Sequence, residues 1–314
     1  MTSIIFMGTP EFSVPVLEGL INHGYEIKAV VTQPDKKVGR KQKITKSPAK
    51  IAAEKHDLPV FQPIKLSGSE EMKQLIDMHA DLIVTAAYGQ FLPTKFLNSV
   101  KIAAVNVHGS LLPKYRGGAP IQYSLINGDQ ETGITIMEMV KKMDAGDIYA
   151  QEALKIEPED NAETLFEKLS YLGRDLLLKT LPSIIDGSIK KTPQDPEQVV
   201  FSPNITKEQE KITVKMTARE ANNMIRALNP DPGAYMMIEG KRFKVWQAEV
   251  AQETTELNPG CLIANKGRFA IAFVNKSVLN LLVVQPSDKK RMEIKSFLNG
   301  QGSKFKPGEE IVDQ

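Results

Sequence analysis

The fold is decided by the stretch NVHGSLLPKYRGGAPIQYSLINGDQETGITIMEMVKKMDAGD, residues 106–147. It begins inside a run over residues 102–107 that is apolar apart from Asn106, and Gly109 breaks that pattern. Such a run predicts a buried strand. Because residues i and i+2 of a strand share a face, Asn106 and His108 should point the same way. They would lie at the strand's carboxyl end, where open α/β sheets bind their ligands.

Asp144 follows one predicted helix (residues 117–127) and one predicted strand (residues 134–139), in a short loop. We expect that strand to end at the same edge of the sheet as the first, which would bring Asp144 to Asn106 and His108. A lone histidine is more often a core residue whose ring nitrogens are hydrogen-bonded within the protein than a catalytic group. An amide on the same face and a carboxylate partner favour catalysis instead. The stretch therefore predicts an enzyme.

The first half of the chain alternates short β-rich runs with helical patterns. This alternation predicts a Rossmann-like, doubly wound and mostly parallel sheet with helices on both faces. The turn Gly8-Thr9-Pro10 lacks the glycine fingerprint of dinucleotide-binding folds, which argues against an NAD-dependent enzyme. Strands are expected near residues 4–7, 27–32, 60 and 82–85, and helices after Glu11, from Ser47, from Ser69 and over residues 162–185.

The composition changes after Gly187. Residues 190–208 contain several prolines and few apolar side chains, which is typical of a linker. It would join a catalytic domain of residues 1–189 to a smaller domain of residues 209–314. There, strand-like runs with closely spaced turns follow a short helix and predict a β-barrel with Trp246 in its core. The helix is expected over residues 218–228 and the strands over 243–250, 261–264, 269–274 and 279–284.

Length and composition fit two ordinary globular domains, since 314 residues exceed the usual single-domain size. The only cysteine is Cys261, so an internal disulfide is impossible, and the four histidines lack a paired metal-binding spacing. We therefore expect no metal. No apolar run reaches the about 20 residues of a membrane span, and the N-terminus enters a core-like strand directly. We expect a cytoplasmic monomer with no membrane partner.

A basic segment stands out against the overall net charge of +2. Residues 28–50 contain eight basic residues and one acid, Asp35, a local net charge of +7. Ser47 and Pro48 predict a helix start that ends this loop. A solvated charged face is the usual origin of such a run, but its density on a loop suits a polyanion. A second basic group comes late, at Lys289, Lys290, Arg291, Lys295, Lys304 and Lys306.

Several of these segments together resemble the folate-dependent formyltransferases. The resemblance covers nearly the whole chain, and within the family it is strongest to members that act on initiator methionyl-tRNA. The central stretch alone is less specific, because relatives that formylate other amines look similar there. The matching segments are Phe6 to Phe12, Gln33-Pro34-Asp35, Ala87 to Pro93, the central stretch, and Lys244-Val245-Trp246.

The resemblance implies transfer of a formyl group from 10-formyltetrahydrofolate to the α-amino group of methionine on initiator tRNA. Asn106, His108 and Asp144 would be catalytic, with Asp144 holding His108 protonated and oriented. The C-terminal domain would resemble an OB-fold and assist tRNA binding. The folate contacts would be Ser110, Leu111, Leu112, Pro113, Tyr88, Gly89, Gln90, Phe91 and Leu92, and the tRNA contacts Lys36, Lys37, Arg40, Lys41 and Lys43.

Two alternatives stay open from the sequence. A formyltransferase for a nucleotide-linked amino sugar would use the same three residues, but it has no need of a strongly basic loop. A tRNA-binding module with a catalytically dead α/β domain is a second alternative. The intact set Asn106, His108 and Asp144 argues against it.

Overall fold

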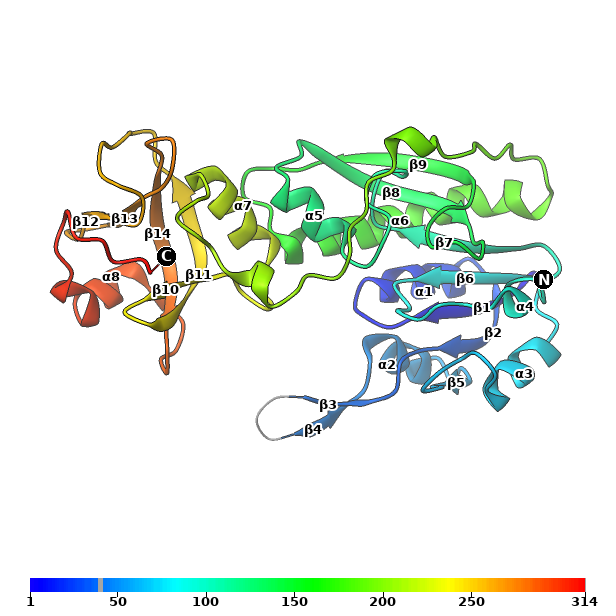
Figure 1. The fold of residues 1–314 in the computed structure, drawn as a ribbon. Helices are drawn as coiled ribbons and strands as arrows, with labels where there is room; N and C mark the ends of the chain where they lie inside the picture. The colour runs from blue at the N-terminus through cyan, green and yellow to red at the C-terminus, as the bar shows by residue number, and fades with distance from the viewer. Residues whose placement is uncertain (39–41, 314) are drawn as a thin grey trace. The chain divides into compact units, whose positions relative to one another are not determined.

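The computed structural model describes residues 1–38 and 42–313 (Figure 1). Its internal contacts divide the chain into two compact units. The first unit comprises residues 1–120, 131–155 and 166–203, and the second comprises 121–130, 156–165 and 204 to the C-terminus. The domain boundaries at residues 189 and 209 stay a prediction.

The first unit is built on one seven-stranded sheet in the order β5-β2-β1-β6-β7-β8-β9. The pairs from β5 to β7 are parallel, whereas β8 and β9 are antiparallel to their neighbours. The predicted mostly parallel sheet is confirmed. The strands are β1 (Ser3–Gly8), β2 (Glu26–Val31), β5 (Val60–Phe61), β6 (Leu82–Ala86), β7 (Ala103–His108), β8 (Glu131–Glu138) and β9 (Ile148–Lys155).

Helices cover both faces of this sheet, as predicted for a doubly wound fold. On one face, Leu75 packs with Ile5 and Ile83 in a buried cluster. On the other face, Gly173 lies so close to Val107 that a Cβ there would come within 2.7 Å of its methyl group. The helices with residues in this unit are α1 (Ser13–Asn22), α2 (Pro48–Lys55), α3 (Glu70–Asp77), α4 (Thr94–Leu97) and α6 (Ala162–Ile185).

The helix start predicted at Ser47 is confirmed. The Ser47 hydroxyl accepts a hydrogen bond from the Lys50 amide at 3.1 Å, and Pro48 occupies the first turn, where its missing N–H costs nothing. The basic loop before it is more ordered than predicted. Its described residues form the antiparallel hairpin β3 (Lys36–Val38) and β4 (Lys43–Thr45).

The second unit contains a curled antiparallel sheet in the order β10-β11-β14-β13-β12, with β15 on β14. Val312 bridges to Ile238 at the end of β10, and Glu310 bridges to Cys261 just before β12, so the C-terminal segment contacts both edges of the sheet. This agrees with the predicted OB-like barrel. The strands are β10 (Tyr235–Ile238), β11 (Lys241–Val250), β12 (Leu262–Ala264), β13 (Phe269–Ala272), β14 (Val278–Pro286) and β15 (Met292–Glu293), and the helices are α5 (Pro120–Ile126), α7 (Ala218–Ala227) and α8 (Ile294–Leu298).

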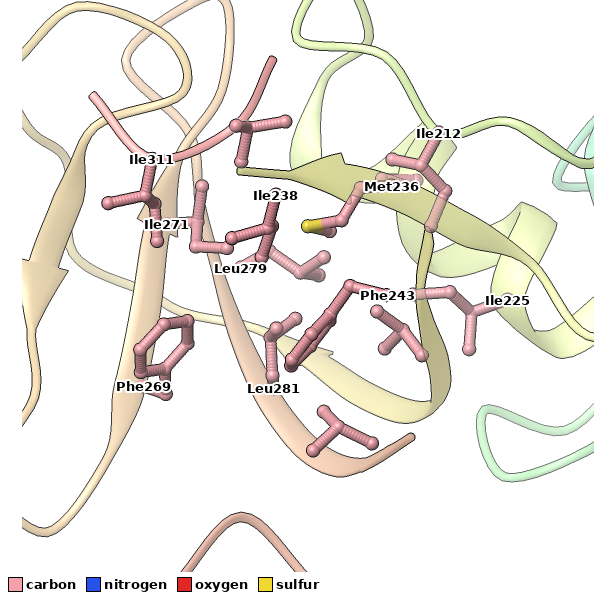
Figure 2. Packing of buried hydrophobic residues seen from close by; sticks show 14 of the residues in the cluster. Ile212, Ile225, Met236, Ile238, Phe243, Phe269, Ile271, Leu279, Leu281 and Ile311 are labelled. Atoms are coloured by element: carbon pink, nitrogen blue, oxygen red, sulfur yellow. The ribbon is translucent and has the colours of Figure 1, made fainter. Parts of the chain in front are cut away.

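The core of the second unit is apolar and rich in aromatic rings (Figure 2). The ring of Phe297 meets those of Phe243 and Phe269 edge-on, with centroids 5.1 and 5.4 Å apart. Trp246 is buried as predicted, although the cations of Lys244 and Arg291 lie over its ring. Within residues 1–38 and 42–313, no helix is long and apolar enough to cross a membrane.

Candidate active site

Asn106 has an amide whose orientation is fixed from the neighbouring strand. The hydroxyl of Thr85 on β6 donates to Asn106 Oδ1 at 2.7 Å, because the two residues are register partners. Oδ1 is the acceptor in this bond. Asn106 Nδ2 makes no hydrogen bond to the residues that the structure describes. The amide therefore presents a free donor from the same face of β7 as His108.

His108 is only 5% exposed, and both ring nitrogens face polar atoms. Nε2 lies 2.9 Å from the carbonyl oxygen of Tyr115. Since a carbonyl can only accept, Nε2 carries a proton. Nδ1 lies 3.8 Å from Asp144 Oδ1, within ion-pair range but too far for a direct hydrogen bond. Nδ1 is thus the nitrogen available to a substrate.

Asp144 reaches His108 by a route that differs from the predicted one. The expectation that the adjacent strand ends at the same edge of the sheet was wrong, because β8 runs antiparallel to β7 and its last residue, Glu138, pairs with Val105. The loop after β8 turns back over the sheet. Asp144 adopts a left-handed backbone (φ 47°), and its Oδ2 accepts from the Gly117 amide at 2.9 Å. The predicted contact with His108 forms nevertheless.

Two further side chains support this loop, and neither was predicted from the sequence. Gln194 Nε2 donates to the carbonyl oxygens of Asp144 and Gly146 at 2.9 and 2.7 Å. Its Oε1 accepts from the Arg116 guanidinium at 3.0 and 2.7 Å. Arg116 is buried at 5% exposure. Arg116 lies within the stretch 106–147, which already pointed to the site, whereas no pattern around Gln194 in the sequence indicates a role there.

The segment around Gln194, expected as linker, packs on the first unit. The amide of Arg116 donates to Val200, and that of Ser202 donates back to Arg116, at 2.9 and 2.8 Å. Gly117 is required beside this ladder, because a Cβ there would lie 2.5 Å from the Ser202 carbonyl oxygen. Polar backbone groups therefore hold a segment that has few apolar side chains.

The predicted folate segment from Ser110 to Pro113 continues directly from β7. Ser110 and Leu112 are buried, whereas Leu111 and Pro113 are half-buried. The carbonyl of Ser110 and the amide of Leu112 both bond to the Thr135 hydroxyl, at 2.6 and 3.1 Å. These backbone groups are consequently held in place by the protein itself.

The second predicted folate segment, residues 88–92, follows β6. Tyr88 and Leu92 are buried, and burial raises the pKa of Tyr88 to about 12, so it stays neutral. Gln90 bonds to the Leu66 amide at 3.0 Å and to the Pro63 carbonyl at 3.1 Å, which fixes the loop. Gly89 and Phe91 are exposed, Phe91 at 62%. The segment thus presents an exposed aromatic ring on a fixed backbone.

The predicted tRNA contacts lie on the β3–β4 hairpin. Lys36, Lys37 and Lys43 are exposed and form no ion pair within the described part of the chain. Arg40 and Lys41 lie outside the described residues. Other basic residues nearby are already paired, since Lys46 contacts Glu54 and Lys50 contacts Asp35 at 2.7 and 2.8 Å. The free charge of the segment is therefore concentrated on the hairpin.

The chain matches two models of known protein families. Residues 1–181 match the formyl transferase model, and residues 204–302 match the model of the formyl transferase C-terminal domain. Methionyl-tRNA formyltransferase of Lactobacillus acidophilus is 83% identical over 314 residues, the whole of both chains. The enzyme of the same name from Lactobacillus johnsonii is 65% identical, again over the whole of both chains.

Among solved structures, an N-formyltransferase from Helicobacter canadensis, in complex with folinic acid and dTDP-3-aminofucose, has a similar fold. Its TM-score is 0.70 at 20% identity, covering 91% of this chain and all of that one. At this identity the likeness supports the fold alone. The two family models and the close relatives go further: the chain belongs to the formyl transferase family.

Proposed function

We propose that this chain transfers the formyl group of 10-formyltetrahydrofolate to the α-amino group of methionine on initiator tRNA, in translation initiation. The observation that carries the proposal is the 83% identity, over the whole length of both chains, with a methionyl-tRNA formyltransferase. The amino-sugar alternative has weaker support, because such relatives are similar at about a fifth of positions.

The folate co-substrate would bind beside His108. A flat heteroaromatic ring needs apolar surface with fixed polar groups at its edge. Phe91 is 62% exposed and Met143 54%, so each presents apolar side-chain surface that a ring could contact. The rigid segments 88–92 and 110–113 would hold the ring, with Leu112 and Pro113 as apolar walls. We assign the folate contacts predicted above to this surface.

Asn106 and His108 would stabilise the charge that develops on the formyl oxygen. The methionine amine attacks the formyl carbon, a C–N bond forms, and the carbonyl oxygen gains negative charge. The Asn106 amide and the His108 Nδ1–H are the two donors, because Oδ1 and Nε2 are already engaged. Donors fixed before the reaction need no reorganisation, which is the usual basis of oxyanion stabilisation.

Asp144 would orient the His108 ring and help to move a proton. The bond from the formyl carbon to folate nitrogen breaks, that nitrogen gains a proton, and the attacking amine loses one. The carboxylate lies 3.8 Å from His108 Nδ1, where it can stabilise positive charge that develops on the ring during the reaction. Through a water molecule it can also accept the amine proton and return it to the leaving nitrogen.

The β3–β4 hairpin would bind the phosphates of the tRNA. Its lysines are exposed and unpaired within the described residues, and such cations bind RNA by releasing condensed counterions. The C-terminal unit would assist with its own basic residues. We further propose that the protein acts as a monomer in the cytoplasm, a state that light scattering of the purified chain would test.

Formylation with labelled 10-formyltetrahydrofolate tests the proposal. Initiator methionyl-tRNA and a nucleotide-linked amino sugar are offered separately to the same enzyme preparation. We expect label on the methionine amine and none on the sugar. Formylation of the sugar with no reaction on the tRNA would overturn the assignment of the acceptor while keeping the chemistry.

A further inference from the structure

We propose that Gln194 is a positioning residue that sets the backbone of the Asp144 loop through two donated hydrogen bonds. The proposal rests on the function proposed above, since it assigns to Asp144 a role in the reaction. Gln194 lies 50 residues from Asp144 and in a segment expected to be linker. It nevertheless donates hydrogen bonds to the backbone carbonyls of Asp144 and Gly146, the residues on either side of Ala145 in the loop.

The orientation of the Gln194 amide is determined by its partners. The Arg116 guanidinium has only donors, and it approaches Oε1 with Nε at 3.0 Å and Nη2 at 2.7 Å. The carbonyls of Asp144 and Gly146 can only accept, so the amide nitrogen must face them. Both N–H groups of one amide are therefore used on one loop.

The bend needs this support because its backbone is unfavourable on its own. Asp144 has a φ of 47°, a left-handed conformation that is disfavoured for most residues other than glycine, although aspartate adopts it more readily than most. Gly146 is packed so closely on the Glu138 carbonyl that a side chain there would collide with it. Two bonds to the carbonyls on either side of Ala145 hold the turn at the point where the carboxylate faces His108.

Arg116 links the hydrogen bonds of Gln194 to the Asp144 carboxylate itself. The residue after it, Gly117, donates its amide to Asp144 Oδ2 at 2.9 Å. Arg116 thus orients Gln194 with its side chain, and the adjoining peptide binds the carboxylate. The backbone and the side chain of Asp144 are fixed by groups that belong to one local network.

The test uses a substitution that keeps one half of the Gln194 contacts. Gln194→Glu still accepts from Arg116 but cannot donate to the Asp144 and Gly146 carbonyls, whereas Gln194→Ala does neither. Gln198→Ala is the matched control, because Gln198 lies in the same segment and, among the described residues, its side chain bonds only to Asp195. The full-length variants are assayed for kcat and KM with both substrates, and amide hydrogen exchange is measured over residues 142–147.

We expect both Gln194 variants to lose about 10-fold or more in kcat, with each KM within about 2-fold, as for a misplaced catalytic group. Exchange over residues 142–147 should rise in both, and Gln198→Ala should match wild type. A Gln194→Glu variant with wild-type kcat and wild-type exchange would overturn the proposal and leave Gln194 as a partner of Arg116 only.

His108→Ala in the same assay separates this inference from the proposed function. If His108→Ala is inactive while Gln194→Glu works normally, the positioning role alone fails. If His108→Ala retains wild-type turnover, the assignment of the site fails instead. Should Gln194→Ala not fold, the outcome rests on Gln194→Glu, in which the buried Arg116 keeps an acceptor.

Discussion

The site around His108 and the β3–β4 hairpin are built in opposite ways. At the site, His108 is 5% exposed, and the Asp144 carboxylate contacts both its ring and the Gly117 amide. On the hairpin, Lys36 and Lys37 are exposed and have no ion-pair partner in the described part of the chain. The polar groups at the His108 site are mostly held by hydrogen-bond or ion-pair partners, whereas the lysines of the hairpin are exposed and without an ion-pair partner in the described part of the chain.

This difference predicts how variants of the two regions should behave. Buried groups with fixed partners act through geometry in a medium of low dielectric, and salt affects them little. Exposed cations act through a field that salt screens, and they bind without a fixed geometry. Changes at the site should therefore alter kcat, whereas changes on the hairpin should alter affinity and its salt dependence.

His108→Ala should have the largest effect. It removes an oxyanion donor and should lower kcat by about 100-fold or more, while folate affinity stays near wild type. The measurement is single-turnover formylation with saturating folate and tRNA. His23→Ala, at the exposed end of α1, is the control and should react normally. Wild-type turnover in His108→Ala would remove His108 from the mechanism.

Asp144→Asn should have the next largest effect. The amide keeps the shape of the side chain but loses the charge beside His108, and an opposite charge at about 4 Å contributes about 1 to 4 kcal/mol. We expect kcat to fall by about 10- to 100-fold with little change in Tm. Asp147→Asn in the same loop serves as the control. If Asp144→Asn unfolds and its folded fraction reacts normally, the carboxylate is structural.

Neutralising Lys36, Lys37 and Lys43 to glutamine should weaken tRNA binding and spare kcat. If each lysine neutralises one phosphate, the slope of log affinity against log salt should shrink by about two units. Filter binding over a salt series measures this. The control replaces Lys65, Lys73 and Lys95, which are exposed elsewhere in the first unit, with the same change in charge. Equal effects in both triple variants would mean that only net charge matters.

The sequence predicted the parts of the site that depend on local pattern. Asn106 and His108 share a face because the strand period is two, and the residues are found so on β7. The meeting of Asp144 with His108 was predicted from a wrong strand direction. Periodicity identifies a strand, but whether it pairs parallel or antiparallel depends on contacts distant in sequence.

Other features had no local signal. The hydrogen bonds from Gln194 to the Asp144 loop join residues about 50 positions apart. Gln194 lies in a proline-rich segment, which has no periodicity from which its position in the fold could be predicted. The β3–β4 hairpin was expected as loop, because lysine is depleted in strands and charge dominated the pattern. β9 was also missed, since it lies at the exposed edge of the sheet and its residues do not alternate regularly between apolar and polar.

Asp35→Asn should have the smallest effect, because it alters the base of the hairpin rather than its cations. Asp35 precedes β3, and its carboxylate accepts from Lys50 Nζ and Gln62 Nε2, each at 2.8 Å. The hydrogen bond from Lys50 lowers the pKa of Asp35. Because this pKa is lowered in the folded protein, the ionised carboxylate stabilises the fold at pH values above the ordinary pKa of about 3.9. That stabilisation is lost as the pH falls through the lowered pKa.

The expected outcome for Asp35→Asn is a fall in tRNA affinity of about 3-fold or less at neutral pH, since Gln62 and the lysines remain. Limited proteolysis of the hairpin at pH 7 should be faster than in wild type. That difference should shrink as the pH falls below the ordinary value of about 3.9 and through the lowered pKa of Asp35, because the wild-type carboxylate then becomes neutral as well. A difference in proteolysis that persists unchanged at low pH would show that the shape of the side chain, rather than its charge, holds the hairpin base.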